Sequence, residues 1–313
     1  MKAIILNEAG GPENLVATEI PIPEVKAGEV LIKVKAISIN PVDIKTRKGL
    51  ALYSKLKEDA PVILGWDVAG EVVKVAEGVT TFEEGDQVFG MVNFPGHGKA
   101  YAEYVAAPAN HLAEKAELIT AQEAVAGTLA ALTAWQVLID EAKVQPGEKV
   151  LIHAAAGGVG HYAVQIAKYL GAFVVGTASD ANYDFVKELG ADDFIDYTAG
   201  AFEDAVKDVD VVFDTVGGSN PLRSLDVLKP GGRLVGIAGG ITDEVKQKAE
   251  KNNIKATAYM VHSNGDDMEQ IAELLEAGTL KSHVSKEFSF DQIAEAHKQI
   301  ETGKTRGKIV ITL

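Results

Sequence analysis

The chain has 313 residues, 47% of them hydrophobic and 24% charged, which suits two globular domains better than one core. Its formal net charge of −15 disfavours nucleic acid and anionic membrane surfaces as partners, since both are bound through basic surfaces. The absence of cysteine excludes disulfides, thiolate metal sites and a cysteine nucleophile. The opening MKAIILNEAGGPE has too short an apolar run for a signal peptide, and no run suits a membrane-spanning helix, so we expect a cytoplasmic protein.

The first part of the chain reads as β-rich. β-Branched runs separated by Gly, Pro and Asp predict strands at EVLIKVKAISI (29–39), WDVAGEVVKVA (66–76) and GDQVFGMV (85–92). The predicted secondary structure changes from strand to helix at Thr120, because Thr120 and Glu123 form a capping-box pattern that predicts a helix start. An Ala- and Leu-rich helical stretch then runs to about Glu141.

From Glu148 onward, apolar strands alternate with helical segments. This alternation predicts a parallel, doubly wound sheet. The predicted strands are KVLIHA, AFVVGTA, DDFIDY, VDVVFDTV, RLVGIAG and a further one near 254–260, and the predicted helices include HYAVQIAKYLG, NYDFVKELG, 202–207 and LRSLDVLKPG. The last fifty residues carry two amphipathic helices, the second at about 291–301, and a terminal strand, KIVITL.

A glycine-rich segment follows the strand KVLIH. Residues 155–160 read Ala-Ala-Gly-Gly-Val-Gly, a dinucleotide fingerprint in which alanine replaces the first glycine. Gly157 would let the backbone approach a pyrophosphate, and Gly160 would let helix and strand pack closely. Such a motif alone can mark a plain turn, but the flanking strands and helix favour dinucleotide binding.

The end of the second strand bears on the choice of cofactor. The position usually held by a carboxylate that binds the ribose falls near Ala178, followed by Ser179. Without that carboxylate a 2′-phosphate is not repelled, which favours NADPH. Asp180 and the lack of Lys or Arg between Thr177 and Tyr183 leave NADH as an alternative.

With these motifs placed, the whole chain resembles the quinone oxidoreductase branch of the medium-chain dehydrogenase/reductase superfamily. The segments that carry the resemblance are NPVDIKTRKG (40–49), PVILGWDVAGEVVKV (61–75), LTAWQVL (132–138), HAAAGGVG (153–160) and GKIVI (307–311). Within the branch, the alkenal and enone reductases look most similar. The resemblance implies an α/β fold in which a Rossmann domain, residues 123–262, is inserted in a GroES-like β-rich catalytic domain, residues 1–122 and 263–313. It also implies a nicotinamide in the cleft between them.

The resemblance implies a zinc-free enzyme. The zinc dehydrogenases of this superfamily hold catalytic zinc with Cys, His and Cys, and Asn40, Trp66 and Leu129 fall on those positions. A metal serves as Lewis acid when charge develops on one ketone oxygen. A quinone or an α,β-unsaturated carbonyl spreads the charge over a conjugated enolate, which hydrogen bonds can stabilise. We therefore expect hydride transfer from the nicotinamide to a quinone or enone.

The resemblance also implies catalytic roles for Asn40, Lys45 and Tyr53. Asn40 would face the nicotinamide or the substrate carbonyl; otherwise it is a turn residue before Pro41. Lys45 would stand near a developing enolate or else is a solvated lysine, and Tyr53 is a pocket lid or hydrogen-bond donor.

The residues expected to bind the cofactor lie in and around the glycine motif. Thr133 matches a threonine near the nicotinamide, or is a helix-interior threonine bonded to a carbonyl. Tyr197 matches a tyrosine at the adenosine end, or packs at a strand end. The expected set is Thr133, Ala156, Gly157, Gly158, Val159, Gly160, Thr177, Ser179 and Tyr197.

Two other functions remain open at this point. One is a trans-2-enoyl thioester reductase, which needs basic contacts for its carrier, and the other is an NADPH-binding protein without significant turnover. The expected partner is a small-molecule quinone or enone, and the resemblance implies a homodimer formed near Ile254–Met260.

Overall fold

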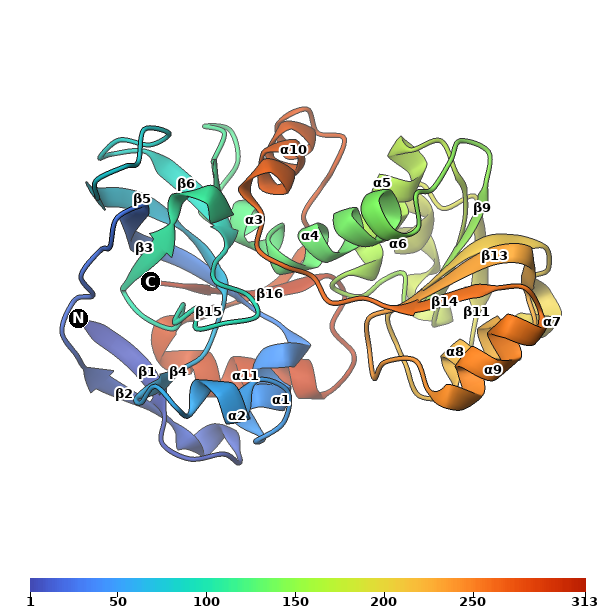
Figure 1. Ribbon diagram of the computed structural model, residues 1–313, viewed down its shortest axis with the longest axis horizontal. Coiled ribbons are helices and arrows are strands. Elements are labelled where there is room, and N and C mark those ends of the chain that lie inside the picture. The colour runs from blue at the N-terminus through green and yellow to red at the C-terminus, as the bar shows by residue number, and fades with distance from the viewer. The chain divides into compact units, whose positions relative to one another are not determined.

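The computed structural model describes all residues, 1–313, and the chain forms two compact units. Unit 1 comprises Met1–Leu132 and Val261–Leu313, and unit 2 comprises Thr133–Met260 (Figure 1). The first boundary lies later in the chain than the expected 122/123, because helix α3 (Ala121–Ala126) packs on the sheet of unit 1. No helix combines the length and the apolar character needed to cross a membrane.

Unit 1 is built on a seven-stranded sheet whose order is β15-β16-β3-β5-β6-β8, with β7 also paired to β3. All of its pairs are antiparallel except β15 with β16. The strands are β3 (Glu29–Ile39), β5 (Asp67–Val75), β6 (Gln87–Met91), β7 (Tyr104–Pro108), β8 (Leu112–Glu114), β15 (Val284–Ser289) and β16 (Lys308–Thr312). A smaller sheet, β2-β1-β4, contains β1 (Lys2–Leu6), β2 (Leu15–Glu19) and β4 (Val62–Ile63).

The helices of unit 1 cover this sheet and its edges. They are α1 (Pro41–Arg47), α2 (Tyr53–Leu56), α3, α10 (Gly265–Glu276) and α11 (Ile293–Glu301). The capping box at Thr120 is confirmed: its hydroxyl oxygen accepts from the Glu123 N–H (3.1 Å), and Glu123 Oε2 accepts from the Thr120 N–H (3.0 Å). Helix α4 (Leu129–Trp135) contains the boundary between the units.

Unit 2 is a parallel sheet of six strands in the order β11-β10-β9-β12-β13-β14, which confirms the doubly wound fold. The strands are β9 (Lys149–Ile152), β10 (Phe173–Ala178), β11 (Asp193–Asp196), β12 (Val209–Asp214), β13 (Leu228–Gly236) and β14 (Lys255–Ala258). Its helices are α5 (Gly160–Tyr169), α6 (Tyr183–Glu188), α7 (Phe202–Ala205), α8 (Asn220–Ser224), α9 (Asp243–Lys251) and a π-helix (Gln136–Glu141).

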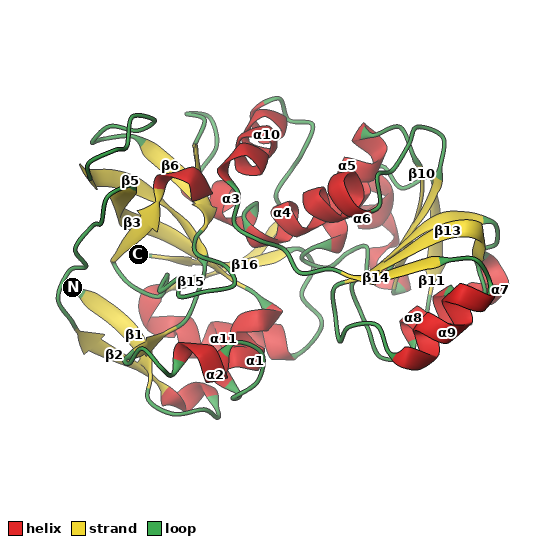
Figure 2. Ribbon diagram, in the orientation of Figure 1, coloured by secondary structure: helices red, strands yellow, loops and turns green.

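The arrangement of unit 2 determines where a ligand can bind. Helices α5 and α6 lie on one side of the sheet, and α8 and α9 lie on the other (Figure 2). Strand order reverses at β9, since β10 follows it on one side and β12 pairs on the other. Ligands of such sheets bind outside the carboxyl ends of the strands at this reversal, where β9 leads into the glycine motif.

Candidate functional site

The glycine motif forms the turn between the end of β9 and the start of α5. A Cβ on Gly160 would lie 2.1 Å from the backbone oxygen of Ala154, so only glycine allows this close packing of turn and helix. A Cβ on Gly157 would lie 3.1 Å from the same oxygen, a tight contact that a small shift can relieve. The fold therefore requires glycine at position 160. At position 157, glycine leaves the outer face of the turn without a side chain, so a ligand can approach the backbone there.

The turn has the properties of a phosphate cradle. Helix α5 has ten residues and no acidic side chain in its first turn. The first N–H groups of a helix lack intrahelical acceptors, and the helix dipole places partial positive charge there. The expected Ala156, Gly157, Gly158 and Val159 all lie in this turn, directly before Gly160. These residues fit the pyrophosphate of a dinucleotide.

A buried histidine supports the turn from below. His153 Nδ1 lies 3.2 Å from Thr177 Oγ1, and His153 Nε2 lies 3.0 Å from Ser224 Oγ. Thr177 Oγ1 also accepts from the Ala154 N–H (3.3 Å), and Thr177 is only 3% exposed. Burial lowers the pKa of His153 to about 4, so its ring is neutral at pH 7. Thr177, an expected cofactor residue, thus bonds inward and holds the turn.

The expected adenosine-end residues lie together at the carboxyl ends of β10 and β11. β10 ends at Ala178, and the Tyr197 N–H donates to the Ala178 oxygen (3.2 Å). Ser179 is half-buried and its hydroxyl accepts from Asn182 Nδ2 (3.0 Å), whereas Tyr197 is 59% exposed. The Asp196 carboxylate also lies here, with its pKa lowered by hydrogen bonds from Thr198. Thr133 is 3% exposed inside helix α4.

In unit 1, Asn40 belongs to a buried polar cluster. It caps the N-terminus of α1, is 1% exposed, and its backbone N–H donates to Asp43 Oδ2 (2.6 Å). Its side-chain Nδ2 donates to Asp67 Oδ2 (2.7 Å), and its Oδ1 accepts from Lys308 Nζ (2.5 Å). We call Asn40, Asp43, Asp67 and Lys308, together with Ser38, the Asn40 cluster.

Burial changes the ionisation of this cluster. It raises the pKa of Asp43 to about 8, with the Asp67 charge adding to the effect and backbone hydrogen bonds opposing it. Asp43 Oδ1 has no hydrogen-bond partner. Burial lowers the pKa of Lys308, while the charges of Asp67 and Asp43 oppose that shift. Burial therefore favours the protonated form of Asp43, which lies beside the Lys308–Asp67 pair.

The other two expected catalytic residues lie outside this cluster. Lys45 is exposed on α1, and Tyr53 is half-buried as the first residue of α2, with Lys57 Nζ 5.9 Å from its ring centroid. Neither residue takes part in the hydrogen bonds of the Asn40 cluster. The structure therefore joins Asn40 to Asp67 and Lys308, not to Lys45 or Tyr53.

The positions compared with zinc ligands hold groups that do not ligate. Trp66 is fully buried, and its indole N–H donates to the Gly96 oxygen (2.8 Å). The side chain of Leu129 is aliphatic and holds no ligand atom, and its backbone N–H donates to Asp67 Oδ1 (3.1 Å). No group of three or more His, Asp or Glu side chains is arranged to hold a metal ion.

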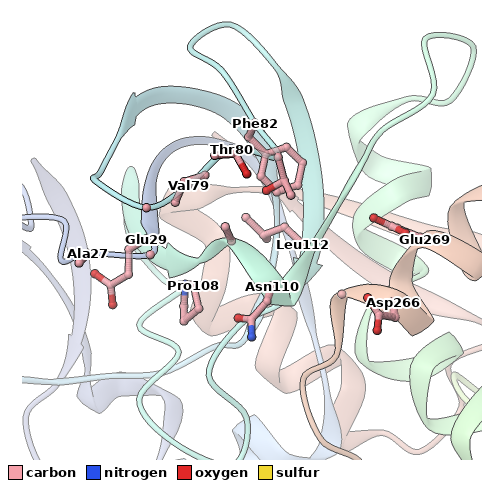
Figure 3. Close-up of a pocket in the computed structure, with 15 residues that line it drawn as sticks. Ala27, Glu29, Val79, Thr80, Phe82, Pro108, Asn110, Leu112, Asp266 and Glu269 are labelled. Carbon is pink, nitrogen blue, oxygen red and sulfur yellow. The ribbon is translucent and has the colours of Figure 1, made fainter.

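A cavity of about 550 Å³ lies elsewhere in unit 1 (Figure 3). Its lining includes Glu29, Phe82 and Asn110, together with Asp266 and Glu269 of α10. None of the expected site residues lines it. Its lining contains three carboxylates and no Lys, Arg or His, which disfavours a dinucleotide phosphate, so the glycine turn is the better candidate for a binding site.

Sequence reasoning missed the roles of Asp43, Asp67, Lys308 and His153, although all four lie in the segments that carry the family resemblance. A signal was present for two of them. Asp67 interrupts the apolar run ILGWDVAG, and Lys308 begins the apolar strand KIVIT. Charged residues in such strands are rarely buried unless they are paired. Each of these two residues therefore predicts a buried partner, but the sequence does not identify which residue that partner is.

Comparisons with known proteins agree with this fold. Residues 26–117 match the alcohol dehydrogenase GroES-like domain, and residues 189–311 match a family described as zinc-binding dehydrogenase. The chain is 34% identical to the 2-methylene-furan-3-one reductase of Solanum lycopersicum and to the chloroplastic NADPH-dependent alkenal/one oxidoreductase of Arabidopsis thaliana, in each case over 99% of this chain and 79% of the relative.

A solved structure also has the same fold as this chain. The quinone oxidoreductase from Coxiella burnetii superposes with a TM-score of 0.95 at 38% identity, covering 100% of this chain and 99% of that one. Both the fold of each unit and the full-length sequence similarity therefore agree with the expected family. The chain belongs to the medium-chain dehydrogenase/reductase superfamily, in the branch that contains quinone oxidoreductases and alkenal/one oxidoreductases.

Proposed function

We propose that this protein is an oxidoreductase that uses NADPH to reduce quinones or α,β-unsaturated carbonyl compounds without a metal ion. The observation that carries the proposal is the glycine turn between β9 and α5, where a Cβ on Gly160 would strike the Ala154 oxygen at 2.1 Å. A close-packed turn at the strand-order reversal of a parallel sheet suits a dinucleotide. Relatives named for NADPH-dependent alkenal/one and quinone reduction support the substrate class.

The residues of unit 2 would hold the dinucleotide. The turn at 156–160, which leads into the N-terminus of α5, would bind its pyrophosphate, as the packing at Gly160 suggests. Ser179 and Tyr197, neighbours at the ends of β10 and β11, would contact the adenosine end, and Thr133 the nicotinamide end. When bound, NADPH supplies a hydride. Thr177 and His153 would keep the turn in shape beneath it.

In unit 1, Asn40 is the candidate for stabilising negative charge on the substrate. An asparagine amide has two N–H donors, and only one of them is used, by Asp67. The second can bond a carbonyl oxygen as charge develops on it. Because Asn40, Trp66 and Leu129 replace the zinc ligands of related dehydrogenases, no Lewis acid is expected, which favours acceptors that delocalise charge. Lys45 and Tyr53 would lie nearer the substrate entrance, and the proton would come from solvent.

The first experiment is an assay of reduced-nicotinamide absorbance. NADPH and NADH are each tested with a quinone, a 2-alkenal, a trans-2-enoyl thioester and a simple ketone. We expect turnover of the quinone or the 2-alkenal with NADPH and none of the ketone. Turnover of the thioester alone would support a thioester reductase instead. Tight NADPH binding without turnover of any acceptor would support a binding protein, and rapid ketone reduction would contradict the metal-free mechanism.

The assembly and location are part of the same proposal. We expect a homodimer in the cytoplasm, with β14 as the candidate contact because it is the edge strand of the unit 2 sheet and Met260 beyond it is 64% exposed. Light scattering at micromolar concentration measures the mass directly. A mass of 33.1 kDa, that of one chain, would contradict the dimer without affecting the proposed reaction.

A further inference from the structure

The Asn40 cluster contains a lysine in the interior of a sheet. Lys308 is 3% exposed and lies on β16, which pairs with β15 on one side and β3 on the other. Its Nζ donates to Asn40 Oδ1 (2.5 Å) and to the Ile39 oxygen (3.2 Å), and lies 3.9 Å from Asp67 Oδ2. The ammonium group therefore donates its hydrogen bonds to Asn40, which caps α1, and to the preceding residue, Ile39.

Asp67 binds the nitrogen of the Asn40 side-chain amide, whose oxygen is bound by Lys308. Its Oδ2 accepts from Asn40 Nδ2 (2.7 Å) and from Ser38 Oγ (2.5 Å), and its Oδ1 accepts from the Leu129 N–H (3.1 Å). A cation thus bonds the oxygen of the Asn40 amide and an anion bonds its nitrogen. Reversing the amide would place N–H groups against the ammonium and oxygen against the carboxylate, so the two ions permit one orientation.

Stability alone is a weak reason for this arrangement. Replacing a buried ion pair by apolar side chains of similar volume is often neutral or stabilising, because desolvation offsets the attraction between the charges. What the pair adds is a fixed direction for the second Asn40 N–H. A hydrogen bond to the amide oxygen also polarises the amide and strengthens its N–H groups as donors.

We propose that Lys308 and Asp67 are positioning residues that orient the Asn40 amide, so that its second N–H becomes the donor for the substrate carbonyl. The inference rests on the proposed function of Asn40 as the group that stabilises the substrate oxygen. Lys308 and Asp67 do not touch the substrate, and they act only through Asn40. Their removal should therefore have no further effect on catalysis once Asn40 is gone.

A double-mutant cycle on the full chain tests this with NADPH and a 2-alkenal. We expect Asn40→Ala to lower kcat about a hundredfold, in the range seen when one such donor is removed. We expect Lys308→Met to lower kcat about tenfold with a smaller change in KM for the alkenal. The double variant should match Asn40→Ala alone. Lys286→Met, an exposed lysine on β15, is the matched control and should leave kcat unchanged.

Two results in the assay would overturn the inference. One is additivity, in which Lys308→Met lowers kcat by the same factor in the Asn40→Ala background. The other is normal turnover by Asn40→Ala, which would refute both the role of Asn40 and its positioning while leaving the reductase proposal intact. If Lys308→Met fails to fold, Asp67→Asn takes its place in the cycle, since it removes the charge and preserves the shape.

A second readout does not depend on turnover. In nitrogen-15 NMR spectra, the side-chain NH2 signals of Asn40 are the pair missing from Asn40→Ala. We expect them to shift or broaden in Lys308→Met and in Asp67→Asn, but not in Lys286→Met. Unchanged signals in the first two variants would overturn the inference. If the wild-type protein reduces no conjugated acceptor, the proposed function fails, and these signals still decide whether the pair orients Asn40.

Discussion

The two units build their candidate sites by opposite means. In unit 2 the site is a backbone turn, in which one contiguous segment, 154–160, relies on small residues and the N-terminus of α5. In unit 1 it is a set of side chains from separate segments, with Asn40 held between Asp67 and Lys308. The turn depends on the space around its glycines, whereas the cluster depends on buried charge. The first should respond to steric change and the second to charge and pH.

The largest effect should come from filling the outer face of the turn. Gly157→Val adds a branched side chain where a Cβ nearly fits, so the fold should persist while the pyrophosphate is blocked. We expect at least a hundredfold loss of NADPH affinity, about 3 kcal/mol, measured by fluorescence titration. Gly160→Ala is the contrasting variant and should mainly lower stability, because its Cβ would overlap the Ala154 oxygen. Undiminished NADPH binding by Gly157→Val would place the phosphate elsewhere.

Acid should remove the stability that one buried, neutral histidine contributes to each unit. Burial lowers the pKa of His153 in unit 2 to about 4 and that of His297 in unit 1 to about 3, against 6.5 when unfolded. Their contributions are fully present above pH 6.5 and are lost as pH falls towards the folded pKa, up to about 3 kcal/mol for His153. Urea unfolding at pH 7, 5.5 and 4.5 measures this loss.

The histidine variants separate the two units in that experiment. His153→Gln should reduce the acid sensitivity of unit 2 and His297→Gln that of unit 1. His97→Gln, outside both buried environments, is the control for the substitution itself. Equal acid sensitivity in all variants would mean that carboxylates, not these rings, control the loss.

A rise in pH should act on unit 1 through the buried Asp43. The pKa of Asp43 rises from 3.8 to about 8 on folding, so the folded state holds an extra proton between these values. Stability from this group is complete below pH 4 and falls by about 1.4 kcal/mol per pH unit until the pH passes 8. Asp43→Asn should flatten that fall in urea unfolding between pH 6 and 8.5, whereas the exposed Asp59→Asn should not. A slope that survives Asp43→Asn would contradict the assignment.

The smallest effect should be on cofactor choice in unit 2. Asp196 lies beside Ala178 at the strand ends where the adenosine 2′-phosphate of NADPH would bind. Asp196→Asn removes a like charge, and we expect the ratio of kcat/KM for NADPH to that for NADH to rise about threefold, as for an exposed charge pair. Asp193→Asn, at the other end of β11, is the control. An unchanged ratio would place the 2′-phosphate away from this edge.

The two sites also differ in how far sequence could predict them. The glycine turn was predictable because its signal is contiguous and its flanking strands are strongly apolar. The partners of Asn40 were not, because β5 and β16 supply them from positions 27 and 268 residues further along the chain. Only the fold brings such residues together.

Local sequence failed in a different way for some elements. Helix α9 went unpredicted because its residues DEVKQKAEK bury only Val245 and Ala249. The segment LRSLDVLKPG was expected to be helical, but α8 ends at Ser224 and strand β13 begins at Leu228. A proline and three glycines in that strand mask its β-character, and its pairing with β12 and β14 determines its conformation.

The place of β16 has a consequence for synthesis on the ribosome. β16 pairs with β3 inside the unit 1 sheet, yet it follows all of unit 2 in the chain. Residues 36–39 of β3 therefore lack this partner in each newly made chain while the six strands of unit 2 are translated, and unit 2 can complete its own sheet first. An uncovered edge of this kind invites pairing with other chains. The nascent protein should depend on chaperones until its final strand emerges and brings Lys308 to Asn40.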